Sequence, residues 1–591
     1  MANRAFGLLT VIYIVLALFA GRLWWLQVVQ YDQYATRSQG NYLKTEAVLA
    51  PRGRIFDRNG KLIAANRLAV DLMYKGGQVL YLDRILSLLK LSALPEAKDE
   101  PVSVMTNVPL ALVPTLAELT SGQENIYLVE RLERTYPRPI SGPVLGYVLL
   151  ANQRQVDKGY DPTEQVGVAG IERALEADLR GVRGVQIVEV NAKRERIRQL
   201  TLREPVPGRD VYLTLDYDLQ KAAERALEEG LQDVNRGRAR FGLPSETEAK
   251  GAIVAVDPAT GEVLAMASAP SFDPTLFAKR PRPQAEIAKV MTDKNLRLLN
   301  RAVQPYTPGS TFKLVSSSLF LEKAYLGADT VFRCAPYIYY GGRLFKNWAS
   351  YDMGNMTVRE AIAQSCNTWY YQAAQTDPRK MVDELAARAR ELGIGRPTGL
   401  EVSEQQGFLP TVAWKRATYD QPWYPGESLS IAIGQGAVQV TPVELARMLA
   451  TITMSGRQPE FHLVKKIGNR ETTPKTTLVP GEYWKVLQEG MRKTVTWGTA
   501  KFRLGDFPVP TAGKTGTAET PGKRLGYEHA WYMGYGPTDP GDPRPPLVVV
   551  VFFENGGGGF DVALPAAKKV MSAYWKVGEY APKPTPPAPG Q

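Results

Sequence analysis

The first apolar run of the chain, residues 6–26, is long enough to cross a membrane as one helix. About 20 helical residues span a bilayer core of roughly 30 Å. The run carries one charge, Arg22, which can extend toward the interface beside Trp24 and Trp25. A cleaved signal peptide is the alternative, but the run is too long and no clean cleavage site follows it. The pattern predicts an anchor, residues 1–27, with a cytoplasmic tip and the bulk of the chain exported.

Short alternating and helical patterns after the anchor predict a mixed module of small elements over residues 28–245. Asn59 and Gly60 are typical of a tight turn between two apolar strands. A short helix is expected over residues 78–95, polar loops from there to Pro137, and a helix followed by a strand over residues 167–191. A further helix is expected from about residue 217, because one apolar face collects Leu219, Ala222, Ala223, Ala226 and Leu227.

The pattern changes near residue 251, where a larger domain is expected over residues 246–578. Apolar runs at residues 252–256 and 262–266 flank a turn-forming loop, which predicts a hairpin. Far downstream, residues 547–553 predict a buried strand and residues 566–575 a helix. Because hairpins supply the strands, the sheet is expected to be antiparallel. The fold class is therefore multi-domain α/β, ending in a proline-rich disordered tail, residues 579–591.

Composition narrows the classes of chemistry that the chain can perform. Of 591 residues, 44% are hydrophobic and 22% charged, which is ordinary for a globular protein. The net charge of +12 suits an anionic surface or polymer, but no nucleic-acid-binding motif is present, so no nucleic-acid partner is expected. Two histidines and two cysteines exclude a four-thiolate zinc site or a multi-histidine metal site. Cys334 and Cys366 could form one disulfide, but two independent thiols are predicted.

The first candidate chemical signal is Ser310 followed by Lys313. Pro308 and Gly309 break the preceding loop, so Ser310 stands where a helix can begin. Residues i and i+3 share a helix face, which places Lys313 one turn behind the Ser310 hydroxyl. With histidines so scarce, Lys313 is the candidate base, and its pKa must fall from about 10.4 toward 7 for that role.

The same spacing also occurs at Ser87 and Lys90. These two residues lie among leucines on an amphipathic pattern, without a preceding Pro-Gly. We interpret Ser87 as an ordinary helix residue and its match to the motif as fortuitous.

Two further signals follow along the chain. Ser365 and Asn367 form a Ser-x-Asn tripeptide, which offers a hydroxyl for proton relay and an amide for a peptide carbonyl. Taken alone, this tripeptide is equally consistent with a polar cap between helices. The second signal is Lys514-Thr515-Gly516-Thr517, preceded by small and apolar residues that indicate a strand. Its glycine would let a ligand backbone approach closely, and its lysine and hydroxyls suit a carboxylate.

Together the three signals resemble the motif set of penicillin-binding proteins and serine β-lactamases. Four further segments resemble penicillin-binding transpeptidase domains, namely residues 306–313, 433–436, 440–442 and 529–532. Three others resemble the class B subgroup, namely residues 52–66, 167–191 and 213–220. The spacing around residues 144–147 and 188–191 is more similar to the elongation type, penicillin-binding protein 2, than to the division type. Asn367 departs from that type, whose members often carry Asp at this position.

The resemblance implies a fold, an activity and roles for the motif residues. The fold is the penicillin-binding transpeptidase fold on an elongated N-terminal pedestal, and the activity is a cofactor-free D,D-transpeptidase acting on D-Ala–D-Ala stem peptides. Ser310 is implied as the nucleophile and Lys313 as its base. Ser365 and Lys514 are implied to protonate the leaving amine, and Asn367 to hold the peptide backbone.

The same resemblance implies the remaining contacts and the partners. The Ser310 and Thr517 N–H groups would bind the oxyanion, and the terminal carboxylate would bind Lys514, Thr515 and Thr517, beside Gly516. A RodA-type glycosyltransferase of the SEDS family, MreC-type elongation proteins and the membrane are the implied partners. The alternatives are a division-type transpeptidase, a D,D-carboxypeptidase or β-lactamase, and a non-catalytic scaffold or β-lactam sensor.

Overall fold

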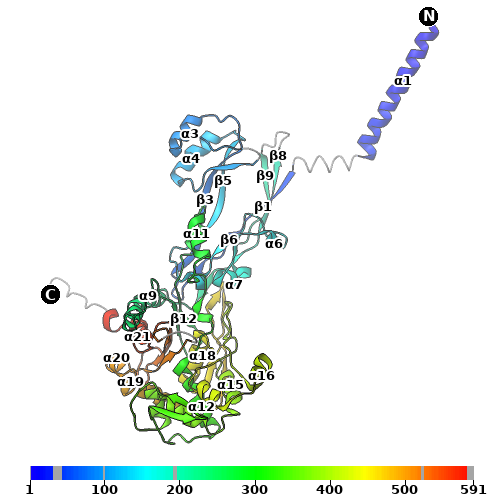
Figure 1. Ribbon diagram of the computed structural model, residues 1–591. Coiled ribbons are helices and arrows are strands. Elements are labelled where there is room, and N and C mark those ends of the chain that lie inside the picture. Colours follow the sequence, from blue (N-terminus) through cyan, green and yellow to red (C-terminus); the bar gives the residue numbers. More distant parts are fainter. Residues whose placement is uncertain (1, 31–42, 98–99, 191–195, 521–524, 582–591) are drawn as a thin grey trace, which may run out of the picture.

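The structure is a computed structural model that describes residues 2–30, 43–97, 100–190, 196–520 and 525–581 (Figure 1). Its first element, α1 (Ala2–Trp24), continues into a π-helical turn, Trp25–Val29, and stands apart from the rest of the molecule. Residues Leu9–Val29 form the one helix in the described ranges that is long and apolar enough to cross a membrane. The predicted proline-rich tail lies almost wholly outside the described residues.

The strands of the N-terminal half belong mainly to a three-stranded sheet and to a seven-stranded sheet that two later strands, β18 and β19, complete. The first has the order β1-β8-β9, built from Leu43–Val48, Gly184–Val190 and Arg196–Arg203. The second has the order β19-β18-β10-β2-β3-β4, with β5 also paired to β3. Its strands are β2 (Ile55–Phe56), β3 (Leu62–Tyr74), β4 (Val102–Met105), β5 (Ile126–Thr135), β10 (Val211–Leu213), β18 (Val464–Ile467) and β19 (Arg470–Glu471). β2 and β3 are antiparallel, as the turn signal at Asn59 and Gly60 predicts.

The prediction of polar loops up to Pro137 is wrong, because β4, α4 (Val113–Thr120) and β5 occupy that stretch. β5 pairs with β3 along its whole length, from Ile126 to Thr135. Its buried charged residues are held by ion pairs, Glu133 with Arg67 and Arg134 with Glu172. Buried positions of a strand are usually apolar, but here charged side chains occupy them. Hydropathy alone therefore does not reveal this strand.

The two helices expected over residues 78–95 and in the first part of residues 167–191 are present, but each is shorter than the segment in which it was expected. α3 (Leu82–Leu89) lies inside the predicted residues 78–95. The predicted helix before β8 is split into α7 (Gly170–Ala174) and α8 (Glu176–Leu179). The smaller elements are α5 (Gly142–Leu145), β6 (Val148–Leu150), α6 (Gln153–Val156) and β7 (Gln165–Gly167).

The C-terminal half is organised around a five-stranded antiparallel sheet of order β12-β11-β23-β22-β21. Its strands are β11 (Gly251–Val256), β12 (Val263–Ala269), β21 (Ala512–Ala518), β22 (His529–Gly536) and β23 (Leu547–Phe553). The predicted hairpin, the predicted strand at 547–553 and the antiparallel arrangement are all confirmed.

Two layers of helices cover this sheet. Side chains alternate across each strand, so Ile253 and Val551 face one core whereas Val254 and Val550 face the other. α9 (Tyr217–Arg240) and α21 (Ala563–Trp575) pack on the first face. α9 buries its predicted apolar face there, although the predicted boundary after residue 245 places this helix with the N-terminal module.

The other face carries a helical layer that holds the motif residues. Its larger helices are α12 (Lys313–Glu322), α13 (Val358–Gln364), α14 (Asn367–Ala374), α15 (Met381–Glu391), α16 (Val412–Tyr419), α17 (Pro425–Ala432), α18 (Pro442–Thr453) and α19 (Trp484–Thr496). Between α12 and α13, two short antiparallel pairs form, β13 (Phe332–Arg333) with β16 (Asn355–Met356) and β14 (Tyr337–Tyr340) with β15 (Arg343–Lys346). The motif residues therefore lie between the edge strand β21 and this layer.

Candidate active site

Ser310 lies on a 3-10 turn, η4 (Gly309–Phe312), that leads directly into α12. This turn packs beside β21, the edge strand of the five-stranded sheet. Gly309 makes the close approach possible, because a Cβ at this residue would lie 2.5 Å from the Thr517 carbonyl oxygen. Its φ of +54° also favours glycine. The nucleophile predicted from the sequence therefore stands next to the predicted Lys-Thr-Gly-Thr strand.

Replacing Gly309 with alanine is expected to displace this turn. The added Cβ meets backbone rather than a flexible side chain, and the residue keeps an unfavourable left-handed conformation. We expect the free energy of unfolding to fall by about 1–3 kcal/mol, as measured by denaturant unfolding and thermal melting. Gly327→Ala is the control, since its Cβ would meet nothing closer than 3.7 Å. An unchanged free energy of unfolding and melting temperature in Gly309→Ala would refute this role.

Lys313, the predicted base, is fully buried. Its Nζ donates hydrogen bonds to the Ser365 carbonyl oxygen at 2.7 Å and to Asn367 Oδ1 at 2.7 Å. It also lies 3.3 Å from Ser365 Oγ and 5.3 Å from the centre of the Tyr370 ring. Lys313 is thus held by the Ser-x-Asn tripeptide, 52 to 54 residues further along the chain.

Lys514, the lysine of β21, is also fully buried and completes the polar centre. Its Nζ donates to Ser365 Oγ at 2.8 Å and to the Thr515 carbonyl oxygen at 2.8 Å. Because both lysines donate to Ser365 Oγ, this oxygen acts as an acceptor for them, and its own O–H can donate to another group. The three predicted signals therefore converge on one serine oxygen.

Burial changes the acid–base properties of both lysines. It lowers the pKa of Lys313 well below the ordinary lysine value, and the neighbouring charge of Lys514 lowers it further. Burial alone lowers the pKa of Lys514 to about 7. A neutral amine, which can accept a proton, is therefore accessible near neutral pH.

The structure places Ser310 one turn before Lys313, but no hydrogen bond within the described ranges involves Ser310 Oγ. The Ser-Lys pair is thus adjacent along the turn, while the hydrogen bonds of Lys313 run to the Ser-x-Asn tripeptide. By contrast, Ser87 and Lys90 of the second Ser-x-x-Lys are both exposed on α3. This agrees with the interpretation of that match as fortuitous.

The two threonines of β21 that flank Gly516 differ in exposure. Thr517 is exposed, and its Oγ1 accepts a hydrogen bond from the Gly559 N–H. Thr515 is nearly buried and shares a 2.8 Å hydrogen bond with the hydroxyl of Thr499. A Cβ on Gly516 would lie 2.8 Å from Thr311 Cγ2, so the absent side chain makes room for the Ser310 turn.

Three structural features were not identified from the sequence. Tyr370 beneath Lys313 and Thr499 beside Thr515 carry no motif that marks them. The prediction of two independent thiols is wrong, because Cys334 and Cys366 form a disulfide with Cα atoms 6.1 Å apart. The chain between them folds back at β13 and β16, which brings together residues 32 apart in sequence, a proximity that spacing alone does not reveal.

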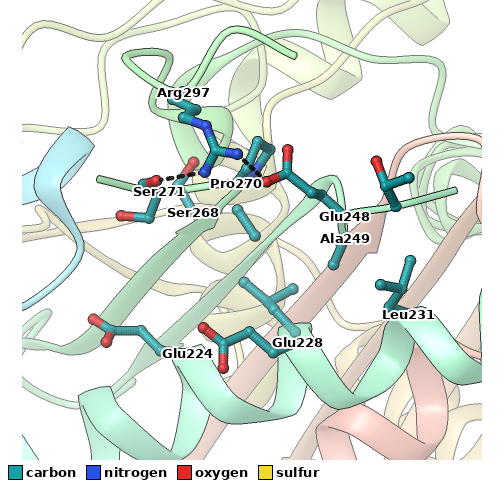
Figure 2. A pocket seen from close by; sticks show the side chains of 12 residues that line it. Glu224, Glu228, Leu231, Glu248, Ala249, Ser268, Pro270, Ser271 and Arg297 are labelled. Atoms are coloured by element: carbon teal, nitrogen blue, oxygen red, sulfur yellow. Dashed lines mark hydrogen bonds and ion pairs between the residues drawn. The ribbon is translucent and has the colours of Figure 1, made fainter. Parts of the chain in front are cut away.

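A separate cleft of about 290 Å³ lies between α9 and the start of the loop after β12 (Figure 2). Glu224 and Glu228 of α9 face it from one side, and Arg297 pairs with Glu248 across from them. Arg297 also donates to the Ser271 carbonyl oxygen at 3.2 Å. The cleft contains none of the predicted site residues, and we do not assign the chemistry to it.

Comparison with known proteins agrees with this geometry. Residues 251–572 match the family model of the penicillin binding protein transpeptidase domain, and residues 47–213 match that of the penicillin-binding protein dimerisation domain. The chain is 30% identical to the peptidoglycan D,D-transpeptidase MrdA of Haemophilus influenzae, covering 93% of this chain and 88% of that protein.

Solved structures give the same result. One, described as "Structural coordination of polymerization and crosslinking by a peptidoglycan synthase complex", is 63% identical with a TM-score of 0.84 and covers 98% of this chain and 99% of that chain. Another is the complex between penicillin-binding protein PBP2 and MreC from Helicobacter pylori. It is 25% identical with a TM-score of 0.74, and covers 90% of this chain and 99% of that chain.

Proposed function

The chain belongs to the class B penicillin-binding protein transpeptidases of the elongation type, and we propose that Ser310 is the residue on which it forms its acyl-enzyme. The protein is a peptidoglycan D,D-transpeptidase. The observation that carries the assignment is the pair of buried lysines, Lys313 and Lys514, that converge on Ser365 beside the Ser310 turn.

Acylation begins when Ser310 Oγ attacks the carbonyl carbon of the D-Ala–D-Ala bond. Neutral Lys313 accepts the Ser310 proton, and the N–H groups of Ser310 and Thr517 stabilise the oxyanion. The bond to the leaving amine nitrogen then breaks. Ser365 gives its hydroxyl proton to that amine and takes another from Lys514, whose Nζ lies 2.8 Å away.

The donor peptide is bound along β21. Lys514, Thr515 and Thr517 hold its terminal carboxylate, and Asn367 contacts its backbone. After D-Ala leaves, the amine of a neighbouring stem peptide attacks the acyl-enzyme, forms the cross-link and releases Ser310. A β-lactam acylates the same serine and leaves it slowly, which makes the protein a β-lactam target.

The direct test supplies the purified protein with nascent peptidoglycan and analyses the products. We expect cross-linked dimers together with released D-Ala. Released D-Ala without dimers would contradict transpeptidation and favour a D,D-carboxypeptidase. If Ser310→Ala rescued a depleted strain as well as the wild type does, a non-catalytic scaffold would be favoured instead.

The lysine pKa values predict how the reaction depends on pH. Lys313 acts as a base only after losing its proton, so acylation is slow at acid pH and accelerates as the pH rises. Because burial lowers its pKa, the midpoint of this rise is expected well below the ordinary lysine value of 10.5. The acylation rate with a fluorescent penicillin, measured from pH 5 to 9, checks this. A rate still rising without a plateau at the alkaline end would contradict it.

We propose that residues 1–27 anchor the protein in the cytoplasmic membrane and that the bulk of the chain lies on the outer side. The disulfide between Cys334 and Cys366 supports this orientation, since disulfides persist in oxidising compartments. The proposed domains are an N-terminal pedestal, expected from the sequence over residues 28–245, and a transpeptidase domain, expected over residues 246–578. Because α9 packs on the sheet of the latter, the working boundary lies before α9.

We further propose that the pedestal binds a RodA-type glycosyltransferase and an MreC-type protein. The named relatives solved within a peptidoglycan synthase complex and with MreC support this proposal. Co-purification of the full chain with each partner is the expected result. A pedestal that serves only as a spacer would give no complex with either.

A further inference from the structure

The tripeptide that holds Lys313 adopts a strained conformation. Ser365 ends α13 with a φ of +55°, in the left-handed region that non-glycine residues rarely adopt. Its carbonyl oxygen is nevertheless one of the two close acceptors of the Lys313 amine. Such a conformation persists only where its surroundings fix it. The contacts that fix the 365–367 turn therefore matter for the lysine.

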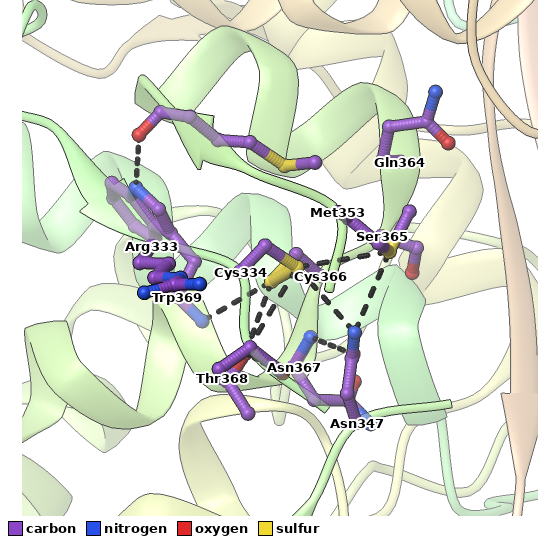
Figure 3. The surroundings of a disulfide bond; sticks show 12 residues. Arg333, Cys334, Asn347, Met353, Gln364, Ser365, Cys366, Asn367, Thr368 and Trp369 are labelled. Carbon is purple, nitrogen blue, oxygen red and sulfur yellow. Dashed lines mark hydrogen bonds between the residues drawn. A yellow bond between two sulfur atoms is a disulfide. The ribbon is translucent and has the colours of Figure 1, made fainter. Parts of the chain in front are cut away.

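The first of these contacts is the disulfide between Cys366 and Cys334 (Figure 3). Cys366 is the middle residue of the turn, and both cysteines are fully buried. Cys334 belongs to a segment, residues 327–356, that leaves the helical layer after α12. The pairing of β13 with β16 closes this segment at its base. The disulfide thus ties the catalytic turn covalently to the 327–356 segment.

The second contact is Asn347, which lies in the same segment. Its Oδ1 accepts the Asn367 N–H at 2.8 Å, and its Nδ2 donates to the sulfurs of Cys334 at 3.4 Å and Met353 at 3.5 Å. Figure 3 shows Asn347 facing Asn367 beside the disulfide. Asn347 therefore joins the turn to the segment by a second, non-covalent connection that also contacts the disulfide.

These contacts surround the residue whose side chain holds the base. Asn367 donates its backbone N–H to Asn347 Oδ1, and its own Oδ1 accepts from the Lys313 amine, 2.7 Å away. The next residue, Thr368, donates through its hydroxyl to the Ala335 carbonyl oxygen at 2.8 Å. A displacement of the 327–356 segment would thus be transmitted to both acceptors of Lys313.

We propose that the 327–356 segment positions the 365–367 turn for catalysis, with Asn347 and the Cys334–Cys366 disulfide as its positioning residues. The segment holds the Ser365 carbonyl and the Asn367 amide oxygen within hydrogen-bond distance of the Lys313 amine. The proposal rests on the role of Lys313 as the base and deepens the proposed function. Neither Asn347 nor the disulfide contacts the reacting atoms in this account.

The test measures the acylation rate with a fluorescent penicillin across pH in four variants. Asn347→Ala removes the acceptor of the Asn367 N–H, whereas Asn347→Asp retains an oxygen there. Cys334→Ser combined with Cys366→Ser removes the disulfide. Arg333→Ala is the matched control, because it breaks the Arg333–Asp352 ion pair of the same segment without touching the turn. Thermal melting identifies temperatures at which every variant is folded.

We expect Asn347→Ala and the double cysteine variant to acylate about 10- to 100-fold more slowly at their alkaline plateau, as for a displacement of about 1 Å. The pH at which their acylation rate rises should also shift, because the Ser365 carbonyl and Asn367 Oδ1, which stabilise the protonated amine, are displaced from it. Asn347→Asp should stay within about threefold of wild type on the plateau, since it keeps the acceptor. Arg333→Ala should match wild type.

Wild-type rates and an unshifted pH dependence in both disruptive variants would overturn the proposal. The proposal would also be overturned if acylation slowed in the disruptive variants without a shift in its pH dependence and Arg333→Ala showed the same slowing. That result would indicate a general loosening of the 327–356 segment. If Asn347→Ala does not fold, the double cysteine variant decides the same comparison. Failure of the wild type to form an adduct on Ser310 would instead contradict the proposed function, so the two failures are distinguishable.

Discussion

Replacing Lys313 with alanine slows acylation by a β-lactam by about 10²- to 10⁴-fold, the contribution of a well-placed general base. The variant lacks the amine whose two close acceptors, the Ser365 carbonyl oxygen and Asn367 Oδ1, lie 2.7 Å away. Lys514 remains in place but donates to Ser365 and to the Thr515 carbonyl. The second-order rate with a fluorescent penicillin is the measurement.

The matched control for this variant is Lys90→Ala, which removes the lysine of the fortuitous Ser-x-x-Lys. Lys90 is exposed at the end of α3 and should be replaceable without loss of rate. Retention of more than about one tenth of the wild-type rate in Lys313→Ala would place the base elsewhere. Lys514 would then be the candidate.

Replacing Ser310 with alanine abolishes both β-lactam labelling and cross-linking. The loss is expected to exceed about 10⁴-fold, because the residue that forms the covalent bond has no substitute. The fold should be retained, since the Ser310 hydroxyl makes no hydrogen bond to any described residue. We expect the free energy of unfolding to change by less than about 0.5 kcal/mol. Gel fluorescence, product analysis and thermal melting measure these quantities.

Ser87→Ala controls for the chemistry of the substitution, because Ser87 has the same i+3 lysine spacing on an exposed helix. It should label and cross-link as the wild type does. Residual labelling of Ser310→Ala at a wild-type rate would show that another residue forms the acyl-enzyme.

Local patterns predict much of the fold. The apolar face of α9 and the strands at 252–256 and 547–553 are confirmed, because each buries a continuous apolar set against one core. Hydropathy does not predict β5, because its Glu133 and Arg134 are buried in ion pairs, whereas charged residues are expected at exposed positions. Likewise, the pairing of β10 with β18 joins residues about 250 apart, and no local signal predicts it.

The sequence predicts which residues form the candidate site, but it does not predict the hydrogen bonds among them. Motif spacing places Lys313 behind Ser310, whereas the hydrogen bonds of Lys313 run to Ser365 and Asn367. The disulfide and Asn347 escaped prediction for the same reason. Their contacts depend on how the 327–356 segment folds back, and one cysteine pair in a sequence does not reveal its geometry.

The central claim is that Ser310, activated by a buried lysine without histidine or metal, carries the acyl group. Peptide mapping by mass spectrometry after penicillin treatment tests it most directly. The account predicts one adduct per chain, on the peptide containing Ser310. An adduct on any other residue, or none with the folded protein, would contradict it.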